Sequence, residues 1–306
     1  MFSAKVICHS IDVKGQEVCS ILARFPRSIL AEMNTHTIIS KNTSSSRAIP
    51  YAREKKRLDW QPYTMREMVL ERPYIPVYFG FNKPGMQPGD EMTEVQRDLS
   101  IKQILKMRDE AVAGADILWA YGMHKGDVNR YIEPYSWTEQ LLTATQWANF
   151  FHLRTPEPPH PAMKRIARMM YLAYRSSKPK LLAEDEWHLP FIDDEDRAKW
   201  PVEELLEMSV ARCARLTNYS FTTGKKDRDR DFKLFDDLRT QGHWSPFGHQ
   251  CKTAKPGDKP SNLKGMLQYR KLFPNECAET FTIPEETLLV WQAEIERPIY
   301  GEKYYV

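Results

Sequence analysis

The sequence predicts an α/β protein in which a mixed sheet packs with long helices, and it predicts one domain over residues 1–306. Residues 4–13 and 17–24 are rich in β-branched and apolar side chains. A short Lys-Gly-Gln link joins them, so they predict a β-hairpin. From Glu91 to about Leu118, charged and apolar residues recur at helical spacing, which predicts a long amphipathic helix.

The other elements follow in chain order. Residues 51–90 hold two weak helical patches among several prolines, so we expect an irregular segment that is partly a covering loop. Residues 178–200 also predict a loop, and residues 287–291 predict a strand. Helices are expected at 28–34, 128–137, 138–153, 162–176, 202–216 and 231–241. The 138–153 stretch is mostly apolar and should therefore be buried.

The composition of the chain narrows the classes of function that it can have. A chain of 306 residues that is 42% hydrophobic can bury a full core, and a net charge of +3 does not favour binding to duplex nucleic acid. The five cysteines are scattered without a CxxC pair, which argues against a zinc site and fits a reducing compartment. The acidic residues at 184–186 and 193–196 indicate a solvated turn, so no metal site is expected. Without a signal pattern or an apolar run near ~18 residues, we expect a cytoplasmic protein of a bacterial or phage-infected cell, with no membrane contact.

One stretch stands out for its chemistry. Residues 35–47 read THTIISKNTSSSR and hold three Thr and four Ser hydroxyls together with an amide, an imidazole, an ammonium and a guanidinium. Such a density of donors suits an anion with several oxygens, above all a phosphate. The alternative is a Ser/Thr-rich loop that caps a helix.

This stretch resembles the signature RHRxxSxNxxSxR of the flavin-dependent thymidylate synthases. His36, Ser40, Asn42, Ser45 and Arg47 all fall at matching places. Thr35 and Thr37 replace the two arginines that flank the histidine. The longer run to Pro50 looks most like a phage-type branch of the family.

Two later regions extend the resemblance. Arg130 lies before a proline, and Asn149 and Arg154 lie in a stretch that ends in arginine, as in the family. Residues 209–215 and 242–249 resemble motifs that precede the signature in typical members, so the chain looks circularly permuted. The resemblance covers a signature block (1–50), a helical block (91–177) and a permuted block (201–275). Gly248 stands where the family has a glutamate.

The resemblance implies FAD-dependent C5 methylation of dUMP to dTMP, with methylenetetrahydrofolate and NADPH as co-substrates, by a homotetramer whose partner is a pyrimidine deoxynucleotide monophosphate. It implies catalytic roles for Arg154 and Ser45. The substrate-binding candidates are Glu32, Ser45, Ser46, Arg47, Arg130 and Arg154; the cofactor-binding candidates are Thr35, His36, Thr37, Thr43, Asn149, His243 and Ser245. Arg270 is a further candidate for phosphate or cofactor charge.

Two alternatives stay open. One is flavin-dependent hydroxymethylation or methylation of dUMP or dCMP for modified phage DNA. Glu32 favours it, because it replaces a glutamine and can accept but not donate a hydrogen bond. The other is a catalytically lapsed protein that binds a nucleotide. Neither a Pro-Cys-His context for a thiol nucleophile nor a GxGxxG or P-loop motif occurs, which disfavours thiol catalysis, dehydrogenases and NTPases.

Overall fold

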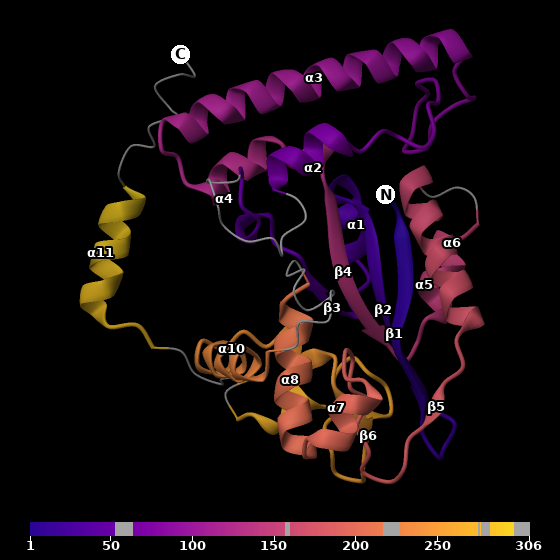
Figure 1. Ribbon diagram of the computed structural model, residues 1–306, viewed down its shortest axis with the longest axis vertical. Coiled ribbons are helices and arrows are strands. Elements are labelled where there is room, and N and C mark those ends of the chain that lie inside the picture. The colour runs from indigo at the N-terminus through magenta and orange to yellow at the C-terminus, as the bar shows by residue number, and fades with distance from the viewer. Residues whose placement is uncertain (53–63, 157–159, 217–226, 275, 277–281, 297–306) are drawn as a thin grey trace. The chain divides into compact units, whose positions relative to one another are not determined.

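The computed structural model describes residues 1–52, 64–156, 160–216, 227–274, 276 and 282–296. Two compact units divide the chain, Met1–Leu272 and Phe273–Val306. The first unit contains a five-stranded mixed sheet with helices around it, so the predicted α/β class is confirmed (Figure 1). In the second unit, the described helix is α11, Glu285–Ile295, and none of its residues is buried.

The sheet has the strand order β3-β4-β2-β1-β5. The predicted hairpin is confirmed as β1 (Ser3–Ile11) and β2 (Glu17–Pro26), which pair antiparallel. Gly15 takes a φ of 80° in their tight turn, a conformation that suits glycine. Strands β4 (Trp137–Ala144) and β3 (Ser40–Thr43) continue the antiparallel pairing, whereas β5 (Lys180–Leu181) pairs parallel with β1.

Each face of the sheet has its own partners. Helices α5 (Ala148–Arg154) and α6 (Pro161–Ser176) form one apolar core with the sheet, which includes Ile21, Phe25 and Phe150. On β4, Leu141 instead packs with residues of α8 (Val202–Ala214), and the neighbouring Leu142 belongs to the first core. Because successive residues of a strand point to opposite faces, the two cores lie on opposite sides of the sheet.

Helix α3 (Glu94–Ala120) packs through Val112 and Ala115 with α2 (Met65–Glu71) and with the short helix α4 (Lys125–Val128). A separate group holds α7 (Asp194–Lys199), α8 and α10 (Arg228–Thr240), and Figure 1 shows the two groups at opposite ends of the sheet. Strands β6 (Cys251–Thr253) and β7 (Met266–Gln268) form a second, two-stranded sheet. The one-turn 3-10 helices are η1 Arg27–Ile29, η2 Ser46–Ala48, η3 Asn129–Tyr131, η4 Glu133–Tyr135, η5 Pro246–Gly248 and η6 Tyr269–Leu272.

Several predicted helices agree with the structure. The stretches 28–34, 162–176, 202–216 and 231–241 contain α1 (Leu30–Asn34), α6, α8 and most of α10, and α3 matches the predicted long helix. The helix expected at 128–137 is wrong, because this stretch holds the two short turns η3 and η4.

The helix expected at 138–153 is also wrong over its first half, which is strand β4; only its second half is helical, in α5. The predicted burial of this stretch is confirmed for β4. A strand whose two faces are both covered is buried on both sides and therefore lacks the alternation that identifies a half-exposed strand.

Two smaller predictions are corrected. Residues 287–291 lie in helix α11, so the predicted strand is wrong. The loop expected at 178–200 contains β5 and α7. An aspartate capping box, in which Asp193 and Asp196 each accept from the other's backbone N–H, begins α7; this start signal lies within the acidic run that was interpreted as a turn.

Candidate functional site

The signature stretch runs from the end of α1 along the edge strand β3 to the 3-10 turn η2. Residues of β4 hold it in place. Gln140 Nε2 donates to Thr43 Oγ1 (2.7 Å) and to Asn34 Oδ1 (3.0 Å). Ser44 Oγ lies 3.0 Å from Thr138 Oγ1 and accepts from the Glu139 N–H. The middle of the hydroxyl-rich run is therefore a strand with a fixed register, and hydrogen bonds to β4 also hold the residue that follows it.

His36 is the meeting point of two cations. Arg154, the last residue of α5, donates from Nε to His36 Nε2 at 2.9 Å, and its Nη2 lies 3.4 Å from Thr35 Oγ1. Lys41 Nζ donates to the backbone carbonyl of His36. The ring of His36 also packs edge-on against Phe150 of α5. A side chain of the helical block thus joins the signature residues.

The surroundings of His36 fix its protonation. Burial, followed by the nearby Arg154 and Lys41 cations, lowers the pKa of His36 to about 4. The imidazole is therefore neutral near pH 7. Because Nε2 accepts from Arg154, the ring proton is on Nδ1.

The permuted block meets the same strand. Ser245 Oγ donates to the Lys41 carbonyl at 2.6 Å and lies 3.2 Å from Asn42 Oδ1. Asn42 Nδ2 donates to the Cys213 carbonyl near the end of α8 at 2.7 Å. The 242–249 turn and α8 are therefore both tied to the signature strand. Residues 217–226 of the permuted block lie outside the described residues.

A second basic group lies at the other end of β3. Arg47 belongs to η2 and Arg130 to η3, and these turns pack together, since Asn129 Nδ2 donates to the carbonyls of Ser46 (2.8 Å) and Ile49 (2.9 Å). Both arginines are exposed, and within the described part of the chain no ion pair of either side chain occurs. Sequence reasoning missed Asn129, although it directly precedes the candidate Arg130.

The remaining candidates divide by exposure. Ser45, Thr35, Thr37, Asn149, His243 and Ser245 are exposed, Glu32 and Thr43 are half-buried, and Ser46 is buried. The Glu32 carboxylate forms no hydrogen bond or ion pair with other described residues. His243 contributes a backbone contact, from its N–H to the Leu238 carbonyl. Ser46 is therefore the candidate least accessible to a ligand.

Arg270 lies in η6, and its partners Asn262 and Gln268 both bond with Ser40. Its Nη2 donates to Ser261 Oγ (2.7 Å), Asn262 Oδ1 (2.9 Å) and Gln268 Oε1 (3.1 Å). Gln268 Nε2 in turn donates to Ser40 Oγ (2.9 Å) and to the Gly248 carbonyl. A side chain at Gly248 would point toward Gln268, Ser40 and Arg270, so these groups fill the direction in which the family's glutamate would extend.

A buried polar chain lies behind the site. His249 Nδ1 bonds with Thr143 Oγ1 (2.8 Å), Thr143 with Ser20 Oγ (2.6 Å), and Ser20 with His188 Nε2 (2.8 Å), whose Nδ1 bonds with Ser10 Oγ (2.9 Å). Burial lowers the pKa of both histidines to about 3. Sequence reasoning missed this polar chain, and the available signals were Ser20 and Thr143, hydroxyl residues that directly neighbour apolar residues of their strands.

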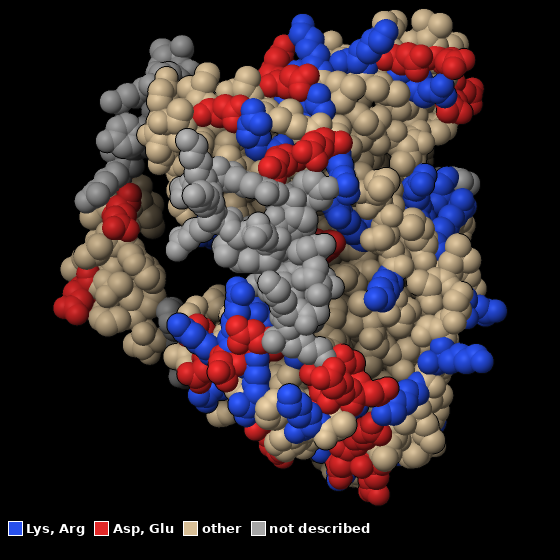
Figure 2. Space-filling model, viewed as in Figure 1, with Lys and Arg blue, Asp and Glu red and all other residues tan. Residues whose placement is uncertain are grey.

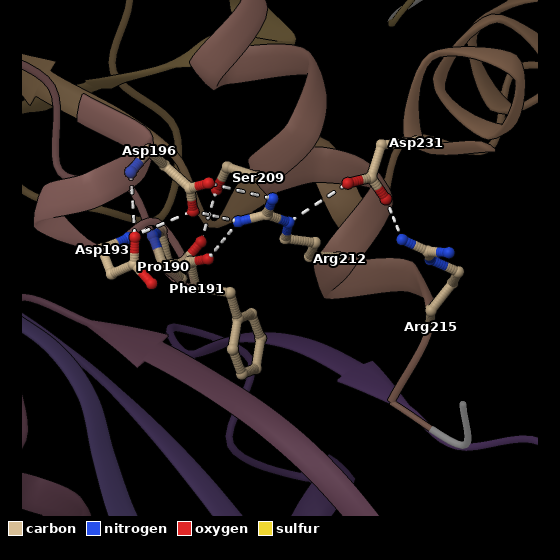
Figure 3. Close-up of polar contacts among 8 residues, drawn as sticks. All are labelled: Pro190, Phe191, Asp193, Asp196, Ser209, Arg212, Arg215 and Asp231. Carbon is tan, nitrogen blue, oxygen red and sulfur yellow. Dashed lines mark hydrogen bonds and ion pairs between the residues drawn. The ribbon is translucent and has the colours of Figure 1, made fainter. Parts of the chain in front are cut away.

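An ion network ties α7, α8 and α10 together (Figure 3). Arg212 of α8 is 1% exposed; it reaches Asp196 Oδ2 (2.5 Å) through Nη1 and Asp231 Oδ2 (3.1 Å) through Nε. Arg215 pairs with the other oxygen of Asp231. The network holds two cations and two anions, so its charge is balanced. It fixes α10, whose end leads into the 242–249 turn that carries Ser245.

Two cavities formed by described residues contain no predicted site residue. Cavities of about 1120 and 890 Å³ lie beside residues 74–92, and neither is lined by the signature. Figure 2 shows Lys and Arg side chains gathered over α6, three of whose residues, Lys164, Arg165 and Arg168, line the smaller cavity. Among the described residues, no His, Cys, Asp or Glu cluster could hold a metal ion, and no described helix is long and apolar enough to cross a membrane.

Comparison with known proteins gives distant structural likenesses. No protein-family model and no curated protein matches the sequence. A UMP/dUMP methylase, PolB from Streptomyces cacaoi bound with 5-Br UMP, aligns with 57% of this chain and 88% of its own, at 14% identity and a TM-score of 0.42. Thymidylate Synthase X from Helicobacter pylori, solved with FAD and dUMP, aligns with 51% of this chain and 67% of its own, at 19% identity and a TM-score of 0.33. Likenesses this weak leave the function to be argued from the chain's own residues.

Proposed function

We propose that this protein is a flavin-dependent C5 methyltransferase that converts dUMP to dTMP, with methylenetetrahydrofolate as the carbon donor and NADPH as the reductant. The observation that carries the proposal is the meeting of three distant segments at β3. Arg154 contacts His36 from the helical block, and Ser245 contacts Lys41 and Asn42 from the permuted block. These are segments that the resemblance to flavin-dependent thymidylate synthases assigns to one site.

The donor set fits FAD and a nucleotide. Both ligands carry phosphates, and Arg47, Arg130, Arg154 and Lys41 form no ion pair with other described residues. Ser45 and Ser245 expose hydroxyls, and Asn149 exposes an amide that can bond with a heterocycle. Bound FAD would supply the two-electron redox chemistry that the polypeptide lacks.

The residues have distinct proposed roles. Arg47, Arg130, Ser45 and Ser46 bind the nucleotide, with Ser46 contributing through its backbone because its side chain is buried. Arg154 has Nε engaged by His36 and Nη2 in a long contact with Thr35, so Nη1 in particular remains for a ring carbonyl of the pyrimidine. There it would stabilise the enolate-like anion whose C5 attacks the carbon donor. Neutral His36 holds the guanidinium in position, and its Nδ1–H is a donor for the cofactor. The other proposed cofactor-binding residues are Thr35, Thr37, Thr43 and His243. Arg270, near Ser40, is a further proposed source of positive charge for a phosphate or the cofactor.

The reaction balances with these co-substrates. The methylene carbon forms a bond to C5 as its bonds to the folate nitrogens break, and the C5 hydrogen leaves as a proton. A hydride equivalent from NADPH reduces the methylene group to a methyl group, so that tetrahydrofolate and NADP⁺ are released. Loss of the C5 proton offers a direct assay. We expect the purified protein with FAD to absorb near ~450 nm and to release tritium from C5-labelled dUMP. A colourless protein that neither binds added FAD nor releases tritium would contradict the proposal and favour a lapsed nucleotide-binding protein.

Glu32 supports a second candidate function. Its half-buried carboxylate forms no hydrogen bond with other described residues and could accept from the exocyclic amine of cytosine. We therefore also propose methylation or hydroxymethylation of dCMP or dUMP for modified DNA. Comparing the rates of tritium release from C5-labelled dCMP and C5-labelled dUMP identifies the preferred base. The mass of the product then distinguishes a methylated from a hydroxymethylated nucleotide. For a cytosine enzyme, Glu32→Gln should shift the preference toward dUMP by about tenfold, the effect of one hydrogen bond to the base.

The resemblance also supports a homotetramer with sites shared between subunits. Light scattering of the purified protein tests this, and a monomer with full activity would contradict it.

A further inference from the structure

Lys41 occupies an unusual place in the candidate site. Its ammonium group donates to the His36 carbonyl, and its own carbonyl accepts from Ser245 Oγ at 2.6 Å. Lys41 therefore links the signature histidine to the permuted turn. The resemblance gives this residue no role, because it stands at an unspecified position of the signature.

Two cations surround His36 without an acid. Arg154 bonds to the His36 ring and Lys41 to the His36 backbone, and within the described residues neither side chain forms an ion pair. Lys41 is half-buried, and burial lowers its pKa. Keeping an ammonium partly out of water without an acidic partner is unfavourable for the protein alone. An anionic ligand would reverse this, because it would neutralise both cations.

The arrangement also compensates for a feature of the sequence. Two arginines flank the histidine in the family signature, whereas this chain has Thr35 and Thr37 there. Lys41 and Arg154 lie outside the Thr-His-Thr triplet at 35–37, and they place positive charge on two sides of His36.

We propose that Lys41 is a binding residue which, with Arg154, forms a subsite for phosphate oxygens around His36. The identity of the ligand rests on the proposed function: the phosphate belongs either to the diphosphate of FAD or to the nucleotide substrate. Phosphate is favoured over a single carboxylate because two cations and the Thr35 hydroxyl lie around His36, and a phosphate presents several oxygens to such donors.

Binding measurements separate the two sources. The dissociation constants of FAD, riboflavin, dUMP and deoxyuridine are compared for the wild type, Lys41→Gln, Lys41→Arg and Lys102→Gln, an exposed control on α3. We expect Lys41→Gln to weaken one phosphorylated ligand at least tenfold, to change the phosphate-free analogue less than twofold, and to reduce the salt dependence of binding. Lys41→Arg should retain most of the affinity, and Lys102→Gln should resemble the wild type.

A stability measurement excludes a purely structural role. If Lys41 served only to bond the His36 carbonyl, Lys41→Gln would lower the melting temperature of the unliganded protein. A cation kept for a ligand predicts the opposite, because its removal relieves the cost of a partly buried ammonium. We expect unliganded Lys41→Gln to melt at or above the wild-type temperature.

The outcomes distinguish this proposal from the proposed function. If the wild type binds neither FAD nor dUMP, the proposed function fails, yet stabilisation of the wild type by inorganic pyrophosphate that is lost in Lys41→Gln would still support the subsite. If FAD or dUMP binds and Lys41→Gln leaves both affinities within twofold, the subsite is refuted while the proposed function stands. Equal weakening of a ligand and its phosphate-free analogue also refutes it, as does the absence of binding by every probe, pyrophosphate included.

Discussion

At the scale of single residues, Arg154 and His36 depend on each other. The guanidinium Nε donates to the imidazole Nε2 across 118 positions of sequence, so each side chain orients the other. The sequence indicated both residues through the signature and through the arginine that ends α5. It did not indicate their direct contact, because the tertiary path of the chain decides which side chains of two separate segments meet.

A change at Arg154 should alter His36 in a measurable way. We expect Arg154→Gln to raise the pKa of His36 above its value of about 4, because the cation beside the ring is removed while the burial remains. NMR titration of the histidine ring measures this shift without any ligand. Arg239→Gln, on an exposed arginine of α10, serves as the control and should leave the His36 pKa unchanged.

The same variant tests the proposed catalytic role. Arg154→Gln should lower the rate of tritium release from C5-labelled dUMP by about 10²- to 10³-fold, the usual effect of removing a positioned donor to a developing anion. Wild-type turnover by this variant would show that Arg154 does not stabilise the anion, whatever its effect on His36.

At the scale of elements, several helices were more predictable than strand β4. Helices such as α6 and α10 lie on the surface and show one apolar face, whereas β4 is covered by a core on each face of the sheet and shows two. The acidic run at 193–196 predicts a solvated turn from local sequence alone. In the structure, Asp196 is instead a buried ion, because Arg212 of α8 pairs with it. Local sequence contains neither the strand neighbours nor the ion partner.

The Arg212 network should be important for stability. Asp231 accepts from both Arg212 and Arg215, so Asp231→Asn leaves two buried guanidinium groups with one carboxylate. We expect a loss of about 3–5 kcal/mol in the free energy of unfolding, as measured by urea denaturation.

The matched control lies on the same helix. Asp236 pairs with Arg239 at the surface, so Asp236→Asn should cost less than about 1 kcal/mol. Similar losses for the two variants would mean that the buried network contributes no more than a surface pair.

At the scale of the whole molecule, the sheet joins the three blocks that the resemblance predicted. The helical block contributes β4 and Arg154, and the permuted block reaches the sheet through hydrogen bonds of Ser245 and His249. Motif spacing could predict which blocks of the sequence contribute residues to the candidate site. It could not predict that a buried polar chain through His249 and His188 joins the sheet to the residues around it, since this chain requires Thr143, Ser20 and Ser10 to lie side by side on separate strands.

The buried polar chain through His249 and His188 predicts that the stability of the fold depends on pH. His188 and His249 have pKa values of about 3 in the folded protein, chiefly because burial disfavours their charged forms, against about 6.5 when unfolded. The unfolded state therefore binds more protons between these values. Stability is fully present above about pH 6.5 and declines as the pH falls toward 3, by up to about 1.4 kcal/mol per histidine per pH unit.

Urea denaturation from pH 7 to pH 4 measures this decline. His188→Gln should be less stable than the wild type at pH 7 but should lose stability less steeply on acidification, because one buried histidine no longer titrates. His152→Gln, at an exposed histidine of α5, should keep the wild-type slope. An unchanged slope in His188→Gln would show that this ring does not resist protonation in the folded state.

The most direct measurement is a crystal structure of the protein with FAD and dUMP. Our account predicts the pyrimidine flat against the flavin ring, with phosphate oxygens within hydrogen-bond distance of Arg47 and of the Lys41–Arg154 pair, and with Ser245 beside the cofactor. Ligands bound only in the cavities beside residues 74–92, or a signature strand that contacts neither ligand, would contradict it.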